Sequence, residues 1–209
     1  MSAWVVIVAG GSGTRFGRPK HTVDLGGLTL WERCRSTFEA IEGIEGVVVV
    51  GDVPDGIPGG ERRRDSVAAG LSRIPDATDW VLVHDAARPL VSVELVHRVL
   101  DTAIGTSADG VVPANPVTDT IKRVEGSKVI ETVDRSHLVS VQTPQAFRLE
   151  LLRYAHTLDL HDAVTDDAGL VERAGGTVIS VPGEVTNIKI TYEADLATAL
   201  SYLEQRGDA

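Results

Sequence analysis

The sequence has few of the features that mark secreted, metal-rich or nucleic-acid-binding proteins. Cys34 is the only cysteine among 209 residues, which excludes an intrachain disulfide and a site built from several thiolates. The formal net charge is -10, which argues against a broad surface for nucleic acid or for an acidic membrane. The chain has no run of about 18 apolar residues and no signal-peptide pattern at its start. We therefore predict a cytoplasmic protein that binds neither membrane nor nucleic acid.

Short apolar runs alternate with amphipathic segments along the chain. The apolar runs, rich in Val and Ile, predict buried strands, and the amphipathic segments predict helices. This alternation is typical of an α/β protein with a three-layer α/β/α, Rossmann-like arrangement and a mostly parallel mixed sheet. We predict a single domain over residues 1–209. Its strands would cover 4–9, 46–51, the start of 80–91, 109–117, 177–183 and 186–191, and its helices 30–43, 64–74, 92–104, 148–158, 166–175 and 193–206.

One stretch departs from this alternation. Residues 118–135 alternate apolar and polar side chains, turn at "EGSK" and alternate again, which predicts a β-hairpin. Both halves of the hairpin carry polar residues on one side. We therefore expect it to project from the body as an arm that covers residues 116–137.

The first predicted strand leads into a glycine-rich stretch, "VVIVAGGSGTRFGRPK" at residues 5–20, which fails three familiar motifs. A dinucleotide fingerprint would need glycine at Phe16, and a P-loop would need lysine at Arg18. A nucleophile elbow would need glycine at Thr14. None of these three motifs therefore explains the stretch.

The same stretch still favours the binding of phosphate. A glycine turn after a buried strand lets backbone N–H groups converge on an anion, and open parallel sheets bind ligands beyond the C-terminal ends of their strands. Arg15 and Lys20 follow the turn and could meet a polyphosphate from the side. A tight structural turn flanked by solvated cations is the alternative.

The pattern "AGGSGTRFGRPK" resembles the glycine-rich signature of nucleotidyltransferases that activate sugars and polyols. Further blocks follow in order and extend the resemblance over nearly the whole chain. Together they resemble the 2-C-methyl-D-erythritol 4-phosphate cytidylyltransferase family of the non-mevalonate isoprenoid pathway. The blocks are "GGERRRDSVAAGL" (59–71), "VLVHDAARP" (81–89), "PVTDTIK" (116–122), "TVDR" (132–135), "VQTPQAF" (141–147), "VTDDAGLVE" (164–172) and "TNIKIT" (186–191).

The resemblance implies a reaction between two anions. A phosphate oxygen of methylerythritol phosphate would attack the α-phosphorus of CTP, and pyrophosphate would leave. Such chemistry needs alignment and charge neutralisation, not a protein nucleophile. Mg²⁺ or another divalent cation would bridge phosphate oxygens, with Asp85 as a possible ligand. The family's hairpin is a dimer arm, so the resemblance also implies a homodimer whose active site is shared across a two-fold axis.

The resemblance also assigns roles residue by residue. Arg135 would enter the partner's site and, with Lys189, position the acceptor phosphate. The positions that match catalytic residues are Arg15, Lys20, Arg135 and Lys189. Those that match CTP-binding residues are Ala9, Gly10, Gly11, Gly13, Gly60, Ser66, Asp85 and Ala86, and those that match acceptor-binding residues are Arg88, Thr120, Arg135, Thr143, Thr165 and Lys189.

Several of these residues have an ordinary structural alternative. Ser66 could cap a helix, and Asp85 could start an Asx turn. Arg88 could pair with a carboxylate instead of a phosphate, and Arg135 could be a solvated surface charge. We expect His84 to lie in the core or behind the site, without a chemical role.

Two other features, an acidic pair and the single cysteine, have a structural interpretation. Asp166 and Asp167 could suggest a metal site, although favourable charges at a helix N-terminus explain them as well. Cys34 is predicted to be an inert thiol on a helix.

The glycine stretch also departs from the family pattern. The family usually has Ala-Ala-Gly where this chain has Ala9-Gly10-Gly11, and the approach to Lys20 is shorter than usual. A helix and strand usually found before Gly59 are replaced by a short loop. These differences leave ribitol 5-phosphate cytidylyltransferase as an alternative with the same fold and chemistry. A non-catalytic nucleotide-binding module and a NAD-dependent enzyme are alternatives from other classes.

Overall fold

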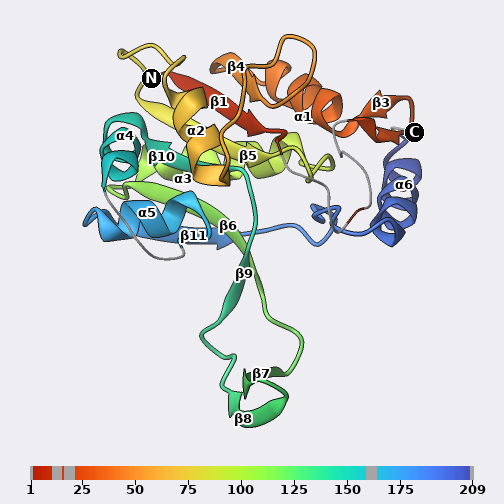
Figure 1. Cartoon of the computed structure of the whole chain (residues 1–209). Helices are drawn as coiled ribbons and strands as arrows, with labels where there is room; N and C mark the ends of the chain where they lie inside the picture. The colour runs from red at the N-terminus through yellow and green to blue at the C-terminus, as the bar shows by residue number, and fades with distance from the viewer. Residues whose placement is uncertain (1, 11–15, 17–21, 159–163, 208–209) are drawn as a thin grey trace.

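A central mixed sheet organises the computed structural model, which describes residues 2–10, 16, 22–158 and 164–207 (Figure 1). Among these residues, seven strands form the sheet, in the order β11-β6-β10-β5-β1-β4, and β9 pairs with β6. β1 runs parallel to β4 and β5, whereas β10 is antiparallel to both of its neighbours. The strands are β1 (Ala3–Val8), β4 (Ile44–Val50), β5 (Trp80–Asp85), β6 (Gly110–Pro116), β9 (Val139–Val141), β10 (Gln145–Arg148) and β11 (Val178–Pro182).

Helices cover both faces of this sheet, as the sequence predicts for a three-layer α/β protein. Successive side chains of a strand point to opposite faces, so Val5 and Ile7 of β1 pack into one core and Val6 and Val8 into the other. The first core includes side chains of α1 (Leu30–Glu39) and α3 (Val93–Gly105). The second includes side chains of α2 (Arg63–Leu71), α4 (Leu149–Thr157) and α5 (Asp167–Arg173).

A third, smaller core packs against α6 (Ala194–Arg206), which lies beside the sheet in Figure 1. It joins α6 to a short hairpin whose strands, β2 (Asp24–Leu25) and β3 (Leu28–Thr29), have two residues each. Phe16, from the glycine-rich stretch, is buried in this core. Among the described residues, no helix is long and apolar enough to cross a membrane.

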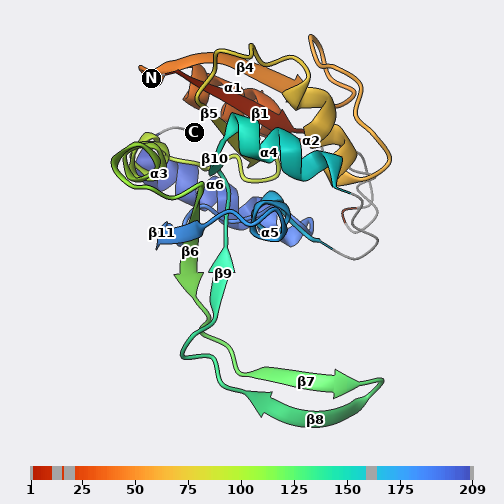
Figure 2. The same ribbon diagram turned by 90° about the vertical axis from the view of Figure 1, so that its left-hand side faces the viewer.

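The predicted arm is present. β7 (Ile121–Glu125) and β8 (Lys128–Val133) form a separate antiparallel hairpin, and Gly126 takes the positive φ of 59° that its tight turn requires. β6 and β9 form the stem, and Figure 2 shows the hairpin projecting well away from the helices and the sheet.

The sequence prediction is wrong in two places. Residues 186–191 are not a strand, although they alternate: Ile188 and Ile190 pack into the third core while Lys189 faces Asp85. Their alternation thus reflects how an irregular segment packs against the body. The Ile190 N–H donates to the Ala87 carbonyl at 2.8 Å and so ties this segment to the body. The sequence also did not predict four short antiparallel strands, β2, β3, β9 and β10.

Candidate active site

Asp85 lies at the centre of the site, at the carboxyl end of β5. Lys189 Nζ donates to its Oδ2 at 2.6 Å, and Arg63 Nε donates to its Oδ1 at 3.0 Å. Burial would raise the pKa of Asp85, but the charges of Arg63 and Lys189 and their hydrogen bonds outweigh burial and hold this pKa well below its usual range. Asp85 is therefore a fixed negative charge between two cations.

Arg63 connects Asp85 to a second carboxylate. Its Nη1 donates to Asp167 Oδ2 at 2.6 Å, and Asp167 Oδ1 lies 3.1 Å from His156 Nε2. The Asp167 side chain is only 1% exposed. Burial would raise its pKa, but the hydrogen bond with His156 and the charge of Arg63 outweigh burial and lower it. Arg63 was not among the predicted site residues.

Thr143 supports the backbone of Asp85 from inside the protein. Its Oγ1 accepts the Asp85 N–H at 3.1 Å and lies 3.1 Å from His84 Nδ1. His84 is fully buried, as predicted, and burial lowers its pKa to about 4. The imidazole is therefore neutral at pH 7 and belongs to the framework behind the site.

Arg88 is held by main-chain carbonyls. Its Nη1 donates to Asn187 O at 2.8 Å and its Nη2 to Val141 O at 3.3 Å. Among the described residues, these main-chain bonds, and not an ion pair with a carboxylate, hold the guanidinium. Asn187 in turn donates from Nδ2 to Thr143 O at 2.9 Å. These bonds fasten the segment that carries Lys189 to the end of the sheet.

The residues predicted to read cytosine lie together on the other side of β1. Gly60 N–H donates to Ser66 Oγ at 3.1 Å, and a Cβ at Gly59 would meet the same oxygen at 2.8 Å. Ser66 lies inside α2, whose N-cap is Arg62, so the predicted alternative of a helix cap is wrong. A Cβ added at Gly10 would lie an ordinary 3.9 Å from Ser66 Oγ.

The remaining CTP-binding positions are only partly described. Ala9 follows β1 and donates its N–H to Val50 O at 2.8 Å, while Ala86 follows β5 and donates to Val8 O at 3.0 Å. Both alanines thus lie at the carboxyl ends of neighbouring parallel strands, the usual place for a ligand. The predicted residues Gly11, Gly13, Arg15 and Lys20 lie outside the described residues.

The other acceptor-binding positions lie on different parts of the molecule. Thr165 is exposed just before α5, close in sequence to Asp167. Thr120 and Arg135 are exposed in the arm, where Arg135 Nη1 donates to Thr118 O. In the part of the chain that the structure describes, the hairpin strands β7 and β8 form a sheet of their own, so within one chain these two residues are not brought to Asp85.

The acidic pair at the start of α5 is structural in this geometry. Asp166 is the N-cap of α5: its Oδ1 accepts the Gly169 N–H at 3.1 Å, and its Oδ2 accepts from Gln145 Nε2 at 3.0 Å. Asp167 is committed to Arg63 and His156. In the part of the chain that the structure describes, no three His, Cys, Asp or Glu side chains are grouped as metal ligands.

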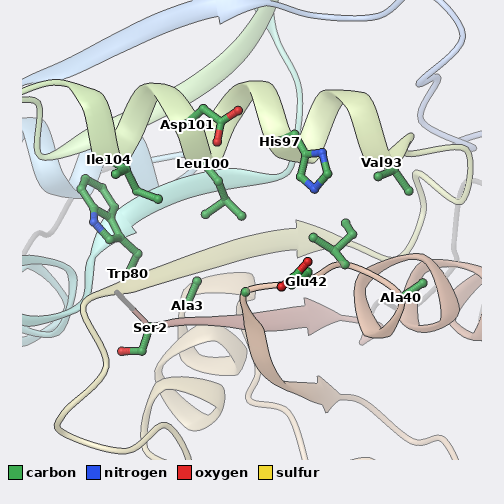
Figure 3. Close-up of a pocket in the computed structure, with 12 residues that line it drawn as sticks. Ser2, Ala3, Ala40, Glu42, Trp80, Val93, His97, Leu100, Asp101 and Ile104 are labelled. Atoms are coloured by element: carbon green, nitrogen blue, oxygen red, sulfur yellow. The ribbon is translucent and has the colours of Figure 1, made fainter.

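A separate hollow of about 480 Å³ lies at the opposite, amino end of β1 and β5. Figure 3 shows His97 and Leu100 of α3 pointing toward the strands, with Ser2, Ala3 and Trp80 at the other wall. None of the described site residues lines it. The carboxyl end, not this hollow, therefore gathers the predicted chemistry.

Comparisons with known proteins identify the family of this chain. The family described as 2-C-methyl-D-erythritol 4-phosphate cytidylyltransferase (IspD) has a model that matches residues 3–205. The protein of that name from Rubrobacter xylanophilus is 43% identical over 98% of this chain and 96% of its own length. The crystal structure of the Thermus thermophilus protein of that name has a TM-score of 0.80 at 34% identity, covering 95% of this chain and 98% of its own.

Some relatives are longer than this chain. The bifunctional enzyme IspD/IspF of Solidesulfovibrio magneticus is 42% identical over 95% of this chain, which covers 56% of that enzyme. The match covers between 36% and 57% of the length of the bifunctional relatives.

Proposed function

Because this chain belongs to the 2-C-methyl-D-erythritol 4-phosphate cytidylyltransferase family, we propose that it transfers CMP from CTP to 2-C-methyl-D-erythritol 4-phosphate. The products would be 4-diphosphocytidyl-2-C-methyl-D-erythritol and pyrophosphate. One observation carries the proposal: Asp85 sits between Lys189 and Arg63 at the carboxyl end of β5, beside the end of β1 where the glycine-rich stretch begins.

The reaction needs no covalent intermediate with the protein. An oxygen of the acceptor phosphate attacks the α-phosphorus of CTP, and the bond to the β-phosphate oxygen breaks as pyrophosphate leaves. Lys189, whose side chain is 43% exposed, can approach the attacking phosphate, and Arg15 and Lys20 would neutralise charge at the α-phosphate. The protein thus contributes alignment and electrostatic stabilisation.

The base would be read beside α2. Ser66 Oγ and the backbone of Gly60 form a polar pair next to Gly10, and a hydroxyl with a backbone group can serve the hydrogen-bonding edge of cytosine. Glycine at 10 leaves room for one more methyl group there. We propose that this pair selects the nucleotide.

Among the described residues, Mg²⁺ fits this site through one carboxylate, that of Asp85. Asp85 Oδ1 is committed to Arg63, so its Oδ2 is the oxygen available for a cation, with Lys189 released toward the acceptor phosphate. Mg²⁺ commonly takes one or two carboxylates together with substrate phosphates and water. When bound, it would supply positive charge to the triphosphate.

We propose that the arm joins two chains into a homodimer. Val124, Val129 and Ile130 of the hairpin are 43–55% exposed, which is a high share for apolar side chains on neighbouring strands. The partner's arm would bring its Arg135 and Thr120 to the Asp85 site. The cytoplasmic location rests on the sparse use of cysteine.

A pyrophosphate-release assay with CTP and Mg²⁺ tests the function. We expect release with methylerythritol phosphate and much slower release with ribitol 5-phosphate. Faster release with ribitol phosphate would support the alternative acceptor instead. No release with either, from folded protein that binds CTP, would contradict an enzymatic function.

A further inference from the structure

A row of five side chains runs from the exposed edge of the site into the body. It consists of Lys189, Asp85, Arg63, Asp167 and His156, each in contact with the next at 2.6–3.1 Å. The five come from five different segments: the stretch after β11, the end of β5, α2, α5 and α4. Lys189 at the outer end has a side chain that is 43% exposed, whereas Asp167 and His156 at the inner end are 1% and 6% exposed.

We propose that Arg63 is a positioning residue of the transfer reaction, which holds the Asp85 carboxylate so that Oδ2 and Lys189 face the substrates. This inference rests on the function proposed above. Arg63 uses two different nitrogens, Nε for Asp85 and Nη1 for Asp167. Because the guanidinium is planar and rigid, fixing it at both ends also fixes the direction of the Asp85 carboxylate.

Asp167 keeps Arg63 from moving. Both of its oxygens are used, one by Arg63 and the other by His156 of α4. Lys189, by contrast, is bound to the row at one end through Asp85, so Oδ2 is the side of Asp85 that can exchange partners when substrates arrive. The row therefore has a fixed inner part and an exchangeable outer end.

A role in folding alone explains this arrangement poorly. Replacing a buried ion pair by apolar residues is often neutral or stabilising, so such pairs are weak evidence for a stability role. The neighbouring Arg62 shows what a surface arginine does here: it pairs with Asp65 three residues away, and its side chain is 67% exposed. Among the described residues, the Arg63 side chain binds the predicted site residue Asp85, whereas the Arg62 side chain binds only Asp65.

Chemical rescue of Arg63→Ala tests the proposal. We expect kcat to fall on the order of 10²-fold while KM for CTP changes less than about threefold, as for loss of an interaction used in the transition state. Guanidinium added at millimolar concentration should restore part of kcat in a saturable way, since it can occupy the space between the two carboxylates. Neutral urea at the same concentration should not, and Arg62→Ala should behave like wild type.

Three results would overturn the inference. They are wild-type kcat in Arg63→Ala, no rescue of a folded Arg63→Ala by guanidinium, or equal rescue by urea. Wild-type protein that releases no pyrophosphate would instead overturn the proposed function, so the two failures are distinguishable.

A second pair of variants covers the case in which Arg63→Ala fails to fold. Asp167→Asn keeps the shape of the side chain but loses the charge that anchors Arg63, and Asp166→Asn is the matched control because asparagine also caps helices. We expect kcat to fall about tenfold or more in Asp167→Asn only, with CTP affinity retained. Equal kcat in the two variants would overturn the proposal.

Discussion

The body and the arm place charged and apolar side chains in opposite ways. In the body, Asp85, Arg63 and Asp167 are charged and largely removed from water, and each is paired. In the arm, Val124 and Val129 are apolar and more than half exposed. Both arrangements cost free energy in an isolated chain, since buried charges must be desolvated and exposed apolar groups must be hydrated.

This difference indicates what each region is for. Paired charges at the end of a parallel sheet prepare a place for anions, because the dipoles and cations are already oriented. Apolar side chains on a projecting hairpin prepare a contact with another protein surface. On the proposed function, the body would hold the chemistry and the arm would complete it in a partner chain.

The largest effect is expected from Lys189→Ala in the body. We expect kcat/KM to fall on the order of 10³-fold, because the cation that we propose to neutralise the reacting phosphate is lost. Steady-state pyrophosphate release measures this effect. Arg73→Ala, which removes an exposed cation beyond α2, is the control and should retain full activity. Comparable losses in both variants would mean that general charge, not the site, matters.

A smaller loss is expected when the apolar face of the arm is made acidic. Val124 and Val129 are cross-strand partners, so Val124→Asp with Val129→Asp places two like charges on one face. We expect a monomer by light scattering and a drop in kcat/KM of at least about tenfold, since Arg135 would no longer reach a partner.

Ile104→Asp is the matched control for the arm variant. This side chain is 50% exposed on α3 of the body (Figure 3). The variant should remain dimeric and active. A dimer in the arm variant, or a monomer in the control, would contradict the proposal that the arm forms the dimer contact.

A moderate effect on stability is expected from His84, behind the site. Burial lowers its pKa from 6.5 to about 4, so the unfolded chain binds one more proton than the folded chain between these values. The free energy of unfolding should therefore be full above about pH 6.5 and fall by up to about 3 kcal/mol as the pH is lowered toward 4. Asp85 and Asp167, with lowered pKa values, add their losses below the ordinary pKa of Asp, near 3.8.

Denaturant unfolding at several pH values measures this dependence. His84→Gln should flatten the curve between pH 6.5 and 4, even if the variant is less stable overall. An unchanged slope in the variant would show that another group is responsible.

The smallest effect is expected at Cys34. Burial, with a further contribution from the charge of Asp85, raises the pKa of this thiol, and no part of the residue is exposed. A thiol reagent should leave the native protein unmodified and fully active, and should react only after unfolding. Rapid modification of the native protein would show that the core beside the site opens more readily than this packing implies.

Much of the fold could be predicted because local pattern and tertiary structure agree there. The Val-rich run of β1 and the two alternating halves of the arm each carry their own periodicity. β10 is only four residues long and antiparallel, and no local pattern in "QAFR" distinguishes it from a loop. The segment 186–191 has strand periodicity because alternate residues face a core, yet it has no ladder partner among the described residues.

The sequence predicts a site residue only where a motif singles that residue out. Asp85, Ser66 and Lys189 follow from ordered blocks of sequence. Arg63 is one of three consecutive arginines, and the letters alone do not tell which of them faces the core. The packing of α2 against the sheet decides this, together with an aspartate 104 residues further along the chain.

The most direct test of the shared site mixes two inactive variants. Arg135→Ala would lack the arm contribution and Lys189→Ala the body contribution, so each homodimer should be nearly inactive. After subunit exchange, verified by native mass spectrometry, the mixture should recover about a quarter of wild-type activity, because about half of the dimers are hybrids with one intact site. Verified exchange without recovery would contradict an active site built from the body of one chain and the arm of another.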